Sequence, residues 1–202
     1  MSQLLKAVAF SCIISSAIAE DVSILRAMNS SLPDCSGNNR DQCWAEAHAA
    51  DRKYEGEWKQ GAPFGFGVIE YQDGRVYNGD VEGGRPMGKG RMSYPNGDSY
   101  NGYFELGQRH GIGIMKYESG AEYKGNWSRD KRHGLAEYRW NDRCNFRDGE
   151  WKDDQMTGVG YATSCKMPRG YITAGYWERG KLIVDEEIEL RGKTYRSNYG
   201  KD

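Results

Sequence analysis

The feature that most constrains this chain is a segment that repeats every 23 residues. Four tyrosines recur at this interval, and each is followed by a glycine two positions later. In three of the four copies an aromatic residue comes four positions after the tyrosine. The copies begin at Tyr54, Tyr77, Tyr100 and Tyr123. A fixed period of this kind indicates a repeat architecture, in which each unit is one supersecondary element packed on its neighbours.

Two further signatures keep the same period. A glycine-rich box follows the tyrosine box, as GAPFGFG, GRPMGKG, GQRHGIG and DKRHGLA. A turn box closes three of the units, as YQDG, YPNG and YESG. Degraded copies follow at RDGEW and TAGYW, in 147–151 and 173–177. The sequence therefore predicts about six units over 54–183, the last two irregular.

Each unit is expected to form a β-hairpin. The box Y-x-G-x-W alternates and places Tyr, Gly and Trp on one face of a strand. Asp73-Gly74 and Asn96-Gly97 are tight-turn dipeptides, because such turns require positive φ angles. The predicted fold is therefore all-β, an elongated single-layer antiparallel sheet of consecutive β-hairpins with short caps at both ends.

Aromatic side chains should line up in columns along this sheet. Their rings are expected to gain from burial and offset stacking, and the glycines between them leave room for rings that lie across a strand. A single layer of hairpins hardly buries both of its faces, so we expect exposed aromatic area that recruits a partner. The candidate aromatic face consists of Tyr54, Trp58, Tyr71, Tyr77, Tyr94, Tyr100, Phe104, Tyr117, Tyr123, Trp127, Trp140 and Trp151.

The segment YEGEWKQGAPFGFGVIEY resembles the MORN repeat (membrane occupation and recognition nexus). The resemblance covers 54–160 well and extends loosely to 183. Known arrays of this family are elongated, twisted sheets of hairpins, found in junctophilins, in plant phosphatidylinositol phosphate kinases and before the catalytic domain of a lysine methyltransferase. The resemblance thus implies a non-catalytic binding or scaffold module.

The N-terminus is typical of an export signal. An apolar run over 7–18 ends at Ala17-Ile18-Ala19, which has the small-x-small form of a signal peptidase site. We expect residues 1–19 to be a signal peptide cleaved after Ala19, which gives a secreted or periplasmic protein. A buried N-terminal helix is the alternative.

Cysteine usage fits an exported chain. Without residues 1–19, four cysteines remain, and they suggest two disulfides. The predicted pairs are Cys35 with Cys43, in an N-terminal cap, and Cys144 with Cys165, between two irregular hairpin tips. Four free thiols in a cytosolic protein are the alternative, and a zinc site is less favoured because no C-x-x-C pair is present.

The predicted caps are 20–53 and 184–202. The first contains the alanine-rich stretch AEAHAA at 45–50, for which a helical turn is one expectation. The second contains IELRGKTYR, which is expected to form a last hairpin or a short edge strand.

A basic edge is a second candidate site. Cationic side chains near the turns could meet anionic lipid headgroups, but Asp80, Glu82, Glu105 and Asp130 lie among them and favour a mixed, solvated edge. The two histidines of the edge occupy equivalent positions in neighbouring repeats, so a bridged metal is an alternative to a simple repeat role. The candidate residues are Arg85, Arg109, His110, Arg132 and His133.

Composition and motifs exclude several function classes. The 28 Lys and Arg against 29 Asp and Glu give a formal charge of −1, which argues against a nucleic-acid binder. The sequence contains no nucleophile elbow, no metalloprotease motif and no complete phosphate loop. We therefore expect no catalytic residue, cofactor, metal or small-molecule substrate. A protein partner or self-association is the first expectation, and peripheral lipid headgroup binding is the alternative.

Overall fold

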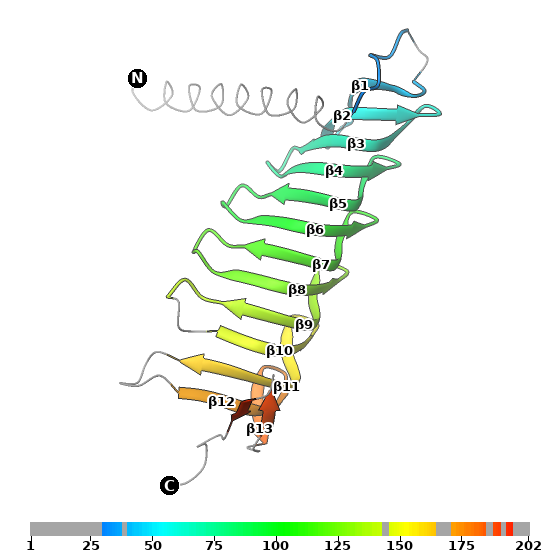
Figure 1. Ribbon diagram of the computed structural model, residues 1–202. Helices are drawn as coiled ribbons and strands as arrows, with labels where there is room; N and C mark the ends of the chain where they lie inside the picture. The colour runs from blue at the N-terminus through cyan, green and yellow to red at the C-terminus, as the bar shows by residue number, and fades with distance from the viewer. Residues whose placement is uncertain are drawn as a thin grey trace, which may run out of the picture.

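The computed structural model describes residues 30–37, 40–142, 146–164, 171–184, 188–190 and 193–195. Within these residues thirteen strands form one antiparallel sheet in chain order, so that the sheet extends as one long ribbon (Figure 1). The strands are β1 (Cys43–His48), β2 (Arg52–Lys59), β3 (Ala62–Tyr71), β4 (Val76–Glu82), β5 (Arg85–Ser93), β6 (Ser99–Glu105), β7 (Gln108–Lys116), β8 (Glu122–Ser128), β9 (Lys131–Arg139), β10 (Phe146–Lys152), β11 (Gln155–Ser164), β12 (Tyr171–Glu178) and β13 (Lys181–Val184).

The predicted fold class is confirmed. Six hairpins follow one another in the described sheet, from the pair β2 and β3 to the pair β12 and β13. The turn boxes join successive hairpins, and Gly74, Gly97 and Gly120 have φ angles of 86°, 89° and 83°. These left-handed angles explain why a glycine ends each turn box.

Both caps contain short strands. The expected helical turn at 45–50 is wrong, because residues 43–48 form strand β1 along the edge of β2. The expected C-terminal hairpin is confirmed by β14 (Ile188–Leu190) and β15 (Lys193–Tyr195), which pair with each other in a separate sheet. In the described part of the chain, no helix is long and apolar enough to cross a membrane.

Each regular hairpin contains a β-bulge. In the third hairpin, Gly102 pairs with Gly113 and Tyr103 pairs with His110, so Gly111 and Ile112 are extra residues on β7. Gly111 has a φ angle of 59°, and the equivalent Gly88 and Gly134 have angles of 61° and 60°. The first glycine of the G-x-G box therefore supplies the left-handed residue that a bulge of this kind requires.

Candidate functional site: the two faces of the sheet

The two faces of the sheet differ in what they expose. We call the side that carries the box tyrosines the ring face, and the opposite side the outer face. On β6 the side chains alternate between them, so that Tyr100 and Phe104 are buried on the ring face while Tyr103 and Glu105 are exposed on the outer face.

On the ring face, each box tyrosine makes the same hydrogen bond. Its hydroxyl donates to the backbone carbonyl three residues later, at 2.7 Å from Tyr77 to Asp80 and at 2.8 Å from Tyr123 to Asn126. Tyr54 and Tyr100 repeat the contact at 2.7 and 3.0 Å. The ring thus lies along its own strand and covers the glycine two positions after the tyrosine. Burial raises the pKa of all four tyrosine hydroxyls above the usual range of this group.

From Tyr77 to Trp151 the rings form a ladder that runs from unit to unit. Tyr100 meets Phe104 of its own unit at 5.1 Å and Trp127 of the next unit at 5.3 Å, measured between ring centroids, with interplanar angles of 88° and 82°. Tyr123 meets Trp127 and Trp151 in the same way. The columns lie where the spacing predicts, but the expected offset stacking is wrong, because these pairs are edge-to-face.

Paired glycines let the rings lie this close to the backbone. Gly102 and Gly113 face each other across β6 and β7, under the Tyr100 ring. A Cβ atom at Gly113 would overlap that ring. The interpretation of these glycines as packing sites is confirmed.

The expectation of exposed aromatic area on this face is wrong. Tyr77, Tyr100 and Tyr123 are 0% exposed, and Trp127 is 4% exposed. The rings cover one another across units, so a single layer buries its ring face without a second sheet. Of the twelve candidate residues, eight are buried, namely Tyr54, Trp58, Tyr77, Tyr100, Phe104, Tyr123, Trp127 and Trp151. The other four are partly buried, namely Tyr71, Tyr94, Tyr117 and Trp140.

Two residues of the candidate basic edge belong to this core. The Arg109 guanidinium lies 4.3 Å from the centroid of Trp127, and its Nε donates to Asp130 Oδ1 at 2.9 Å. Arg132 repeats the arrangement on Trp151 at 4.6 Å and on Asp154 at 3.1 Å. Each arginine therefore covers a ring and ties one hairpin to the turn of the next.

The rest of the basic edge is dispersed. Arg85 and His133 are exposed, and His110 Nδ1 lies 3.2 Å from Glu105 Oε2. Among the described residues no group of three or more His, Cys, Asp or Glu side chains could hold a metal ion. The five edge residues do not form a continuous cationic surface, because two of them are paired in the ring face.

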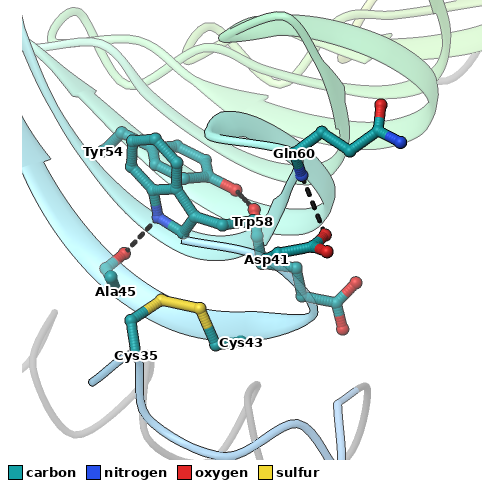
Figure 2. Close-up of a disulfide and its surroundings, with 8 residues drawn as sticks. Cys35, Asp41, Cys43, Ala45, Tyr54, Trp58 and Gln60 are labelled. Atoms are coloured by element: carbon teal, nitrogen blue, oxygen red, sulfur yellow. Dashed lines mark hydrogen bonds between the residues drawn. A yellow bond between two sulfur atoms is a disulfide. The ribbon is translucent and has the colours of Figure 1, made fainter. Parts of the chain in front are cut away.

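The predicted disulfide between Cys35 and Cys43 is present. Cys43 lies opposite Trp58 in the register of β1 and β2, and the Trp58 Nε1 donates to the Ala45 carbonyl at 3.0 Å. Figure 2 shows the disulfide beside this indole, so the N-terminal cap closes the first unit of the ring face. Cys144 and Cys165 lie outside the described residues, as do residues 1–19.

The outer face carries an exposed apolar stripe that the repeat pattern did not predict. The residue after the bulge glycine lies on this face, and it is exposed at Ile112 (66%), Leu135 (69%) and Val159 (38%). Val159 pairs with Tyr176, which is 54% exposed. We call Tyr103, Ile112, Leu135, Val159 and Tyr176 the outer stripe.

The first two units differ from the outer stripe. At the equivalent position the first unit has Phe66, which packs against the buried Trp44 and Val68. The second unit has Lys89 there, and the neighbouring residues of these two units include Glu57 and Asp80. These two carboxylates accept backbone N–H groups of the bulges, from Phe66 and Lys89. The sequence contains this signal, since the residue after the bulge glycine is Lys89 in the second unit and Ile112, Leu135 and Val159 in the next three.

Comparison with known families agrees with this geometry. The model of the MORN repeat matches residues 54–74, 77–99, 100–122, 123–144 and 148–165. The chain belongs to the MORN repeat family. A comparison with curated proteins gives no match. MORN repeats are generally non-catalytic and act as binding modules for proteins or lipids.

Proposed function

We propose that this MORN repeat protein is an exported, non-catalytic scaffold that binds a protein partner through the outer stripe. The observation that carries the proposal is the run of exposed Ile112, Leu135 and Val159 at one repeated position. Large exposed apolar residues grouped on one face mark interaction sites on soluble proteins.

A hollow beside the stripe supports a protein partner over a lipid surface. It has a volume of about 550 Å³ and is lined by Leu135 and Val159 together with Lys124, Glu137 and Glu150. A shaped apolar site with a charged rim is typical of protein recognition. A lipid headgroup site needs clustered cations, and Arg109 and Arg132 already pair with Asp130 and Asp154.

The test is affinity capture with the oxidised, full-length chain. The variant Ile112→Lys/Leu135→Lys should lose the captured protein, because two charges would be desolvated in the contact. The control variant Gln60→Lys/Gln108→Lys adds the same charge at exposed turn-side positions and should capture it as the parent chain does. Equal capture by both variants would place the partner elsewhere.

Two accompanying measurements separate the alternatives. Light scattering of the same proteins detects self-association, in which case the partner is a second copy of this chain. Co-sedimentation of the parent chain with anionic vesicles at physiological salt would contradict the proposal if the stripe variant sedimented equally well and no protein was captured.

Export is the second part of the proposal. The Cys35–Cys43 disulfide supports it, because such bonds persist in oxidising compartments. Expression of the full chain with a C-terminal tag, followed by N-terminal sequencing, should give a mature start at Glu20. An intact N-terminus on a protein retained in the cytosol would contradict it.

A further inference from the structure

The fifth unit breaks the tyrosine column. Its box reads RDGEW, so Arg147 occupies the position that Tyr123 fills in the fourth unit. Both residues pair with Tyr138, one from each side of β9. A cation therefore stands where the four preceding units have a buried ring.

A second exchange accompanies the first. Met156 takes the position of Arg132 in the glycine-rich box, and it is 0% exposed. Its methyl group lies against Gly149 and Gly160, where the tyrosine hydroxyl lies in the regular units. The space over the glycine pair is therefore filled, and the Arg147 side chain is directed elsewhere.

The Arg147 guanidinium lies among aromatic rings. Its carbon is 5.6 Å from the centroid of Trp140 and 5.8 Å from that of Trp177. In the described part of the chain it has no ion pair or hydrogen bond to a carboxylate. Arg132, the neighbouring cation, is already paired with Asp154. Arg132, Arg147 and Asp154 together therefore carry one net positive charge.

A cavity opens at this point of the ring face. It has a volume of about 260 Å³, and its lining includes Arg132, Tyr138, Trp140, Arg147, Trp151 and Asp154, the carboxylate that is paired with Arg132. Partial burial and then the charge of Arg132 lower the pKa of Arg147, so the protein itself leaves this cation under-compensated. Within the described residues, the Trp151 indole N–H is the buried side-chain group without an acceptor, whereas the equivalent Trp127 N–H donates to the Gly113 carbonyl.

We propose that this cavity binds a carboxylate attached to an apolar or aromatic body. A guanidinium presents two parallel donors that match a carboxylate, and one negative charge balances the one that Arg147 leaves. The surrounding rings would pack against the apolar body of the ligand. The site lies on the ring face and is independent of the outer stripe.

The experiment is an NMR titration of tryptophan indole signals with benzoate and with its neutral analogue benzamide. Benzoate should shift the signals of Trp140 and Trp151, which line the cavity, and benzamide should not. The variant Arg147→Gln should weaken benzoate binding at least about tenfold, and Arg147→Lys, which keeps the charge, should weaken it less. The control Arg75→Gln removes a cation that is paired with Asp73 on another unit and should leave binding unchanged.

Two arms identify the source of the carboxylate. The first arm uses a peptide with a free C-terminal phenylalanine and the same peptide as its C-terminal amide. If the free acid binds more tightly than benzoate and the amide does not bind, the ligand is a chain terminus. Benzoate binding alone assigns it to a small organic acid. Equal shifts with benzamide, or benzoate binding unchanged in a folded Arg147→Gln variant, would overturn the proposal. A failed capture experiment on the outer stripe leaves this result unaffected.

Discussion

The ring face and the outer face of this ribbon follow the same repeat but use it differently. On the ring face, Tyr77, Tyr100 and Tyr123 are identical and fully buried. On the outer face, the equivalent residues Lys89, Ile112 and Leu135 differ in charge and size and are exposed. The repeated residues thus hold the units together, and the varied residues give each part of the ribbon its own surface.

The largest effect is expected from raising the pH, because this ionises the buried tyrosines along the whole ring face. Burial raises the pKa of the Tyr77, Tyr100 and Tyr123 hydroxyls above the ordinary value of about 10. In the unfolded chain these groups ionise near pH 10, so their contribution to stability is complete below that pH and falls as the pH rises further. We expect cooperative alkaline unfolding, in which the last part of the tyrosinate absorbance appears together with loss of the β-sheet circular dichroism. Full ionisation of the tyrosines in an intact sheet would show that the ring face is open to water.

The next effect compares a packed glycine with a turn glycine. Gly113→Ala places a methyl group against the Tyr100 ring, so it should lower the free energy of unfolding by about 1–3 kcal/mol or more. At Gly61 an added Cβ atom would have no atom within 4 Å, so Gly61→Ala is disfavoured only by the φ angle of 78°. This substitution should lower the free energy of unfolding by about 1 kcal/mol. Denaturant unfolding of the two variants measures the difference. Equal losses of free energy of unfolding would mean that the paired glycines are needed only for their backbone angles and not for the space they leave for the rings.

A smaller effect concerns the contacts between units. Asp130→Asn keeps a residue that tolerates the φ angle of 67° but removes the charge that holds Arg109 over Trp127. We expect a loss of about 0.2–1 kcal/mol, the range of partly exposed ion pairs. The loss should shrink at high salt, because salt screens the ion pair. Asp98→Asn is the salt-independent reference, since no arginine contacts the Asp98 carboxylate in that turn. A salt-independent loss at Asp130 would assign the contact to the hydrogen bonds alone.

Much of the fold could be predicted from the sequence because its signals are local. The alternation in Y-x-G-x-W, the turn glycines such as Gly74 and the short spacing of Cys35 and Cys43 each determine structure within a few residues. The burial of the rings could not be predicted in the same way. It depends on Tyr100 meeting Trp127 of the next unit and on Arg109 covering that ring, and both contacts join residues more than fifteen positions apart in the chain.

The candidate site was harder to predict for the same reason. Aromatic residues at a fixed period indicate either an exposed stripe or a core, and alternation alone does not separate the two. The informative positions are those where the period holds but the residue changes. Ile112 replaces Lys89 between two glycines, and Arg147 replaces a tyrosine. Where one residue of a strict repeat changes while the fold stays the same, packing does not require the new residue, so it is a candidate for a functional role.

The smallest expected effect is on the outer face, and it completes the comparison. Ile112→Lys/Leu135→Lys should change the free energy of unfolding by less than about 0.5 kcal/mol, because both side chains are exposed by about two thirds and bury little apolar area on folding. The same two substitutions are expected to abolish capture of the partner, so stability and binding would respond to opposite faces. Thermal unfolding of the variant beside the parent chain measures this. A large loss of stability would mean that the stripe packs against part of this chain, and the exposed surface would then no longer support a partner site.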